Sequence, residues 1–175
     1  MLFPRGAIGF SKKRRNWVSR IIAWFTRSRW SHTFIVFQDH PEVLVLEAGT
    51  YQVQLVPITK YASSSYDVAY FVPEHVPVEQ VEIGIKKAGT KIEASYGWLQ
   101  LAGFIPVVFF KRILGMKISN PARGGIVCSE LVLQYLRGID PGGKWDAMDK
   151  NAVSPEDLFS ELVSDQRFVP VAAEK

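Results

Sequence analysis

The stretch GGIVCSELVLQYL, residues 124–136, contains Cys128, the only cysteine among the 175 residues. Two glycines and an apolar pair precede Cys128, and the apolar residues that follow it have a spacing that predicts a helix. A single cysteine excludes an internal disulfide and a zinc site made of several cysteines. Cys128 is therefore either a small buried hydrophobic side chain or a reactive thiol at the start of a helix, where the helix dipole favours the thiolate.

A reactive cysteine needs a base nearby and a group that orients the base. Of the three histidines, His40 and His75 lie in turn-like segments, whereas His32 begins the predicted strand HTFIVF. If residues 38–41 form the loop of a hairpin, His32 lies directly opposite Glu47 on the same face of the sheet. The Glu47 carboxylate would then fix the tautomer of His32. The alternative is an ordinary cross-strand polar pair.

The order of the other segments indicates the fold class. Strands are predicted first and helices later, which is typical of an α+β domain. Besides 32–37, strands are expected at 6–10, 43–48, 51–57, 65–73 and 167–171. Helices are expected at 16–27, 76–92 and 98–114, from Cys128 onward, and from Ser154-Pro155, which is a typical helix start. No shift in composition marks a boundary, so a single domain over residues 1–175 is expected.

The composition is that of a globular protein with a hydrophobic core, at 47% hydrophobic and 22% charged residues. No segment approaches the roughly 20 apolar residues that a membrane span requires. The first residues, MLFPRGAIGFSKKRR, do not have the charge order of a secretory signal. A cytoplasmic location is therefore expected by default, from which a phage or a secretion system could deliver the protein elsewhere.

The positive charge is concentrated at one end of the chain. Residues 1–38 contain eight basic residues and no acidic one, whereas 13 basic residues face all 17 acidic ones in the remainder. This asymmetry indicates an anionic partner, such as a membrane surface or a cell-wall polymer, and the acidic body disfavours nucleic acid. The aromatic residues in KKRRNWVSRIIAWFTRSRW, residues 12–30, also leave open a non-catalytic membrane-binding or anion-binding module. A solvated helix face explains the same charges without a partner.

A set of stretches in fixed order resembles the circularly permuted branch of the papain-like, NlpC-type superfamily. YiiX-type proteins belong to this branch, and lecithin:retinol acyltransferase-like enzymes are relatives. The stretches are WSHTFIVF (30–37), VLVLEAG (43–49), YQVQLVPITKY (51–61), Tyr96 and VCSELV (127–132). The resemblance covers about residues 6–137. It implies an antiparallel sheet packed against helices, with the histidine strand early in the chain and the nucleophile helix late.

The resemblance implies a Cys-His-Glu triad in which Cys128 is the nucleophile, His32 the base and Glu47 the orienting residue. It also places Tyr96 beside the site, where the tyrosine either donates to the oxyanion or only packs. At the helix start, the backbone N–H groups of Cys128 and Ser129 are expected to stabilise an oxyanion. This chemistry requires no metal and no cofactor.

The sequence thus predicts a cysteine hydrolase that acts on a peptide or acyl substrate through a thioester. The commonest work of the superfamily is amide cleavage in bacterial cell-wall peptides, so an amidase or peptidase acting on peptidoglycan is the first choice. The basic segment suits a negatively charged wall. The apolar stretch 98–110 leaves open a thioesterase, a lipid acyl hydrolase or an acyltransferase, although a core helix explains the same composition.

Overall fold

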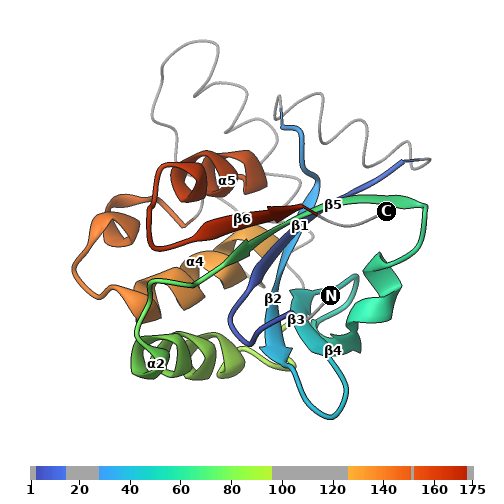
Figure 1. Cartoon of the computed structure of the whole chain (residues 1–175), viewed down its shortest axis with the longest axis horizontal. Coiled ribbons are helices and arrows are strands. Elements are labelled where there is room, and N and C mark those ends of the chain that lie inside the picture. Colours follow the sequence, from blue (N-terminus) through green and yellow to red (C-terminus); the bar gives the residue numbers. More distant parts are fainter. Residues whose placement is uncertain (1–2, 15–27, 96–125, 151, 173–175) are drawn as a thin grey trace.

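The strand that begins at His32 lies in the interior of a six-stranded antiparallel sheet of order β4-β3-β2-β1-β5-β6. The computed structural model describes residues 3–14, 28–95, 126–150 and 152–172 (Figure 1). The strands are β1 Ile8–Lys13, β2 His32–Gln38, β3 Leu44–Ala48, β4 Val53–Pro57, β5 Tyr66–Val72 and β6 Val169–Ala172. The helices are α2 Val78–Gly89, α4 Cys128–Ile139 and α5 Pro155–Val163, with short 3₁₀ helices η1 Ile58–Tyr61 and η2 Lys144–Ala147.

The predicted α+β class is confirmed, and most predicted elements are present near their expected positions. The helix expected from Ser154-Pro155 has a full capping box. The Ser154 hydroxyl accepts a hydrogen bond from the Asp157 N–H at 3.1 Å, and the Asp157 carboxylate accepts one from the Ser154 N–H at 2.9 Å. The helices expected at 16–27 and 98–114 lie outside the described residues. No helix within the described ranges is long and apolar enough to cross a membrane.

Both faces of β2 are buried, which explains its nearly continuous apolar sequence. Side chains alternate along the strand, so Ile35 packs into the core beneath the helices, whereas Phe34 and Val36 pack into a second cluster on the opposite face. Tyr61 of η1 belongs to this second cluster. The sheet therefore carries helices α2 and α4 on one face and η1 on the other.

Helix α4 is held close to α2, which lies beside it in Figure 1. The approach depends on two glycines, because a Cβ added to Gly138 would lie 2.5 Å from the Cα of Gly84. On the buried side of α4, the Tyr135 hydroxyl donates a hydrogen bond to the Gly6 carbonyl at 2.8 Å. These contacts fix α4 against the sheet and so fix the position of its first residue, Cys128.

The register of the β2–β3 hairpin differs from the prediction by two residues. Glu47 lies opposite Phe34, so the predicted direct pairing of Glu47 with His32 is wrong. The hairpin closes at Gln38 and Leu44, so its loop is longer than the predicted 38–41 and displaces the pairing by three residues. An extra residue of β2 between Val36 and Gln38 then takes back one, which leaves an offset of two. An offset of two preserves the alternation of faces, so His32 and Glu47 still lie on the same face, as diagonal rather than direct neighbours.

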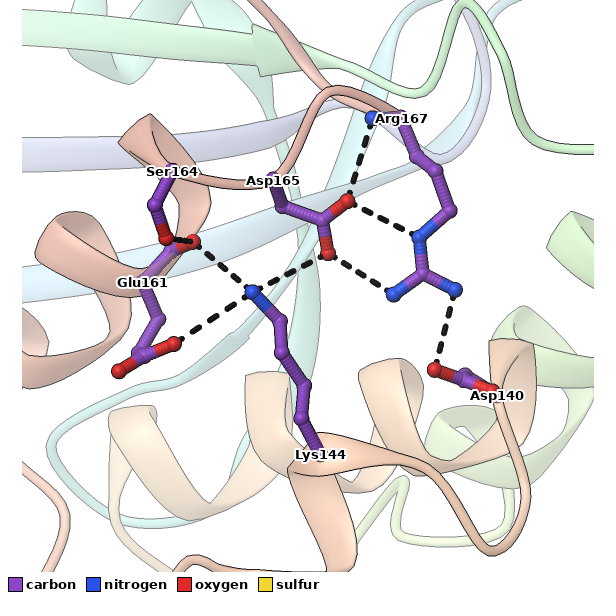
Figure 2. A network of polar contacts seen from close by, with 6 residues as sticks. All are labelled: Asp140, Lys144, Glu161, Ser164, Asp165 and Arg167. Carbon is purple, nitrogen blue, oxygen red and sulfur yellow. Dashed lines mark hydrogen bonds and ion pairs between the residues drawn. The ribbon is translucent and has the colours of Figure 1, made fainter.

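An ion network joins the end of α4 to the approach to β6 (Figure 2). The Arg167 guanidinium donates to both oxygens of Asp165, at 2.9 and 2.8 Å, and to Asp140 at 3.0 Å. The Nζ of Lys144 lies 3.3 Å from the same Asp165 carboxylate. Burial favours the protonated form of Asp165, but the hydrogen bonds and charge of Arg167 outweigh it and lower the pKa of Asp165 to about 2.

Replacing Asp165 by asparagine is expected to lower the free energy of unfolding at neutral pH by about 2 kcal/mol. The carboxylate stabilises the fold fully above its unfolded pKa of about 3.9, and this stabilisation is lost as the pH falls towards its folded pKa of about 2. Urea unfolding across pH measures the difference, which should shrink over that acidic window. Glu161→Gln, at an exposed partner of Lys144, is the control and should change stability by less than about 1 kcal/mol. Equal stability of wild type and Asp165→Asn at neutral pH would contradict this account.

Candidate active site

Three side chains from three elements meet at one end of the sheet. His32 is the first residue of β2, Glu47 lies in β3, and Cys128 is the first residue of α4. The Nε2 of His32 lies 3.5 Å from Oε2 of Glu47, and the His32 and Cys128 side chains lie close enough for each to shift the pKa of the other. Because Nε2 faces the carboxylate, Nδ1 is the ring nitrogen left for the thiol. The imidazole therefore lies between the sulfur and the carboxylate.

The surroundings of Cys128 favour its thiolate. The residue is 8% exposed, and burial by itself raises the pKa of a thiol. The hydrogen bond and charge of His32, together with backbone hydrogen bonds from Thr33 and Ser129, outweigh burial and hold the pKa of Cys128 below that of a free cysteine. The position at the N-terminus of a 12-residue helix acts in the same direction.

His32 is correspondingly held as an imidazolium. Burial disfavours the charged ring, but hydrogen bonds to Cys128 and Glu47, and their negative charges, raise the pKa of His32 to about 9. A lowered thiol pKa and a raised imidazole pKa together define a pH range in which the thiolate–imidazolium pair is the stable state.

Glu47 is a buried carboxylate surrounded by hydrogen-bond donors. Its side chain is 0% exposed. It accepts from Gln54 Nε2 at 3.1 Å, from Lys60 Nζ at 2.6 and 2.8 Å, and from the Tyr61 hydroxyl. Burial raises the pKa of a carboxyl group, but His32, Lys60 and Tyr61 outweigh it and hold the pKa of Glu47 far below its usual range. The carboxylate is thus charged at all pH values at which the protein is expected to work.

The aromatic ring of Tyr61 also lies beside the imidazole of His32. Its ring is stacked on Phe34, with centroids 4.1 Å apart and 15° between the planes, and lies 6.1 Å from the His32 ring at 20°. Burial and the Glu47 charge raise the pKa of Tyr61, so its hydroxyl keeps its proton and remains a donor. The ring and the hydroxyl together restrict the orientation of His32 and Glu47.

The structure brings together the three residues that the sequence predicted for the site, whereas the sequence did not predict the donors around Glu47. Strand alternation could have identified Gln54, which lies directly opposite Glu47 in the β3–β4 ladder. Lys60 and Tyr61 come from η1, a single turn that no periodicity predicts.

Of the two other residues predicted for the site, the structure describes Ser129 but not Tyr96. The Ser129 hydroxyl donates to the Val153 carbonyl at 2.7 Å, so the side chain ties α4 to the segment before α5, whereas the Ser129 backbone hydrogen-bonds to Cys128. Tyr96 lies outside the described residues.

The chain that leads into β2 is fastened by α5. Glu156 accepts from the Arg29 N–H at 2.6 Å and from the Ser28 hydroxyl at 3.3 Å. The Trp30 ring packs against Phe159 with centroids 5.4 Å apart. These contacts fix the residues just before His32, and so restrict where the imidazole can lie.

Comparison with solved structures supports the architecture implied by the motifs. The chain matches a structure titled "Crystal structure of metalloprotein yiiX from Escherichia coli O157:H7, DUF1105" with a TM-score of 0.57 and 18% sequence identity. The match covers 99% of this chain and 99% of that chain. This chain has the YiiX fold. The resemblance to YiiX-type proteins inferred from sequence is confirmed at the level of the fold. No family model and no curated protein sequence matches the chain.

Proposed function

We propose that this protein is a cysteine hydrolase in which Cys128 is the nucleophile, His32 the acid and base, and Glu47 the orienting residue. The observation that carries the proposal is the position of His32 between a thiol at a helix N-terminus and a fully buried carboxylate. An inert buried cysteine needs neither partner. The YiiX fold supports a hydrolase, because papain-like folds of this kind place a cysteine and a histidine in this relation.

In the proposed reaction, the Cys128 thiolate attacks the carbonyl carbon of the substrate. Backbone N–H groups at the start of α4 stabilise the oxyanion, and the His32 imidazolium gives its proton to the leaving group. The acyl group is then a thioester of Cys128. Neutral His32 removes a proton from a water molecule, which attacks the thioester and releases the acid and the thiol. Glu47 keeps the ring oriented through Nε2 in both halves of the reaction.

The proposed substrate is an amide bond in a bacterial cell-wall peptide. Ser11 lies opposite His32 in the β1–β2 ladder, so the basic residues that follow it in β1 lie towards the same end of the sheet as the site. Lys13 and Arg14 are exposed there, and so is Arg29, which precedes His32. These cations support binding to an anionic polymer near the nucleophile.

The matching structure is titled a metalloprotein, which raises the question of whether the site of this chain could hold a metal ion. Among the described residues, no group of three or more His, Cys, Asp or Glu side chains is placed to hold a metal ion. His32 is engaged by Glu47 and by Cys128. The side chains of this site therefore do not fit a metal centre, and no step of the proposed mechanism uses one.

The alkylation rate of Cys128 across pH tests whether the pair is assembled. With one thiol in the chain, iodoacetamide reports on Cys128 alone. The wild type is expected to remain reactive at about pH 6, well below the free-thiol pKa of about 8.5. His32→Ala should lose about 100-fold in rate at that pH, because its thiol is then almost entirely protonated.

His75→Ala is the matched control, because His75 is an exposed histidine outside the site, and its profile should follow the wild type. A wild-type thiol that titrates like a free cysteine, or a His32→Ala profile identical to the wild type, would refute the proposed pair.

A further inference from the structure

Lys60 contacts the site, although no step of the proposed hydrolysis uses it. Its Nζ bridges the two oxygens of Glu47, at 2.6 Å from Oε1 and 2.8 Å from Oε2. The Lys60 side chain is 40% exposed, whereas that of Glu47 is 0% exposed. A surface cation therefore reaches inward to a carboxylate that water does not touch. A buried charge needs such a partner to remain ionised.

Lys60 and His32 share a single carboxylate. The Nε2 of His32 is 3.5 Å from Oε2 of Glu47, which is farther than either contact of Lys60. Coulomb interactions act over such distances, so the positive charge of Lys60 partly offsets the negative charge of Glu47 at His32. The ammonium group also repels the imidazolium. Lys60 therefore lowers the net stabilisation of protonated His32 at this site.

The other groups around Glu47 do not have this effect. Besides Lys60, the groups that face it are Tyr61 from η1, Gln54 from β4 and His32 from β2, with Cys128 of α4 beyond the imidazole and Tyr66 of β5 against the Tyr61 ring. Tyr61 and Gln54 donate hydrogen bonds without a charge. Among the residues that the structure describes around this carboxylate, the two cations are thus Lys60 and protonated His32.

We propose that Lys60 is a positioning residue that sets the upper pH limit of the thiolate–imidazolium pair. This inference rests on the proposed function for its catalytic meaning. Four charges alternate along the site, positive on Lys60, negative on Glu47, positive on His32 and negative on Cys128. By occupying the carboxylate, Lys60 makes the imidazolium easier to deprotonate.

Easier deprotonation of His32 would favour the second half of the proposed reaction. Once Cys128 is acylated, its sulfur has no charge, and His32 must be neutral to take a proton from water. Glu47 alone would hold the imidazolium protonated. Lys60 limits that hold, so that the same histidine acts as an acid in the first half and as a base in the second.

The test compares alkylation of the single thiol across pH in Lys60→Met, Lys60→Gln and Lys60→Arg. The wild-type profile should have a lower step, where the pair forms, and an upper step, where His32 loses its proton. Lys60→Met and Lys60→Gln should move the upper step up by about one pH unit or more, because the positive charge of Lys60 then no longer offsets the charge of Glu47 at His32. Lys60→Arg keeps the positive charge and should restore the wild-type position.

Lys144→Met is the matched control. Lys144 is 37% exposed and pairs with Asp165, a 6%-exposed carboxylate outside the site, so its loss removes a similar ion pair without touching His32. Its upper step should stay at the wild-type pH. Titration of His32 by NMR gives the same comparison without a reagent.

The outcomes separate this inference from the proposed function. An upper step that stays at the wild-type pH in both neutral variants would overturn the role of Lys60 and leave the pair intact. A wild-type profile with one step at the pH of a free thiol would overturn both. If Lys60→Met does not fold, Lys60→Gln decides, because it keeps a hydrogen-bond donor while it removes the charge. If neither folds, a Lys60→Arg profile unlike the wild type would overturn the inference, and one like it would support a role for the charge.

Discussion

Replacing Cys128 by alanine is expected to lower the rate of peptidoglycan amide cleavage by about 10⁴-fold or more. The thioester cannot form without the sulfur, because Cys128 is the only cysteine in the chain. Purified peptidoglycan is the substrate, and the appearance of new amino groups measures cleavage. Cys128→Ser should be almost as inactive, because a hydroxyl is not ionised by an imidazole in the way a thiol is.

Folding must be measured beside activity in these variants. Cys128 belongs to the core cluster, but alanine removes only one sulfur atom, so the unfolding midpoint should fall by only a few degrees. Cleavage that survives in folded Cys128→Ala would refute the role of the thiol. If the wild type cleaves detergent-dispersed lipid esters and leaves peptidoglycan intact, the chemistry stands and the substrate is a lipid acyl group.

Replacing Glu47 by glutamine is expected to lower both activity and stability. Donors approach both carboxylate oxygens, with Gln54 at Oε1, His32 and Tyr61 at Oε2, and Lys60 at both. Glutamine has one oxygen and one NH₂ group. The donors at one of the two former oxygen positions would therefore face an NH₂ group, which cannot accept their hydrogen bonds. The free energy of unfolding should fall by about 2–3 kcal/mol. The rate of hydrolysis should fall on the order of 10³-fold, because the imidazole loses its orientation and the charge that stabilises it.

Glu82→Gln provides the same substitution in a different setting. Glu82 is exposed and pairs with Arg5, so its replacement should change stability by less than about 1 kcal/mol and leave thiol alkylation as in the wild type. Urea unfolding and initial rates on one substrate give both comparisons. Equal behaviour of Glu47→Gln and Glu82→Gln would show that the buried carboxylate has no special role.

Much of the fold could be predicted because local chemistry and global structure agree in this chain. The run HTFIVF is apolar on both faces and forms a central strand, and Ser154-Pro155 begins a helix with the expected cap. The order of His32, Glu47 and Cys128 along the chain also helped to predict the site. A family in which these residue types follow in the same order is expected to share the arrangement of strands and helices, and not only the residue types.

What could not be predicted depends on small departures from regular geometry. The β2–β3 hairpin closes at Gln38 and Leu44, three residues away from the predicted pairing, and the irregularity between Val36 and Gln38 takes back one of these three. Neither Val36 nor Gln38 is of a type that marks a bulge. Lys60 and Tyr61 reach Glu47 because the chain makes one 3₁₀ turn after β4. Such a turn is too short to have a periodicity, so the donors that keep Glu47 charged are invisible in the sequence.

The strand order of the sheet places some residues of the site on interior strands and others beside an edge strand, which opens more easily. β2 and β3, which hold His32 and Glu47, have strand partners on both sides, whereas η1 and its lysine follow β4, an edge of the described sheet. Edges of a sheet open more often than its centre, at a fraction of the global free energy. Each time β4 and η1 detach, Glu47 loses the charge of Lys60 together with the hydrogen bonds of Gln54 and Tyr61, whereas β2 and α4 still hold the histidine and the thiol. The protonation of His32 therefore responds to fraying of the sheet margin well before the molecule unfolds, and warming should alter the pH response of the thiol at temperatures where circular dichroism still reports a native fold.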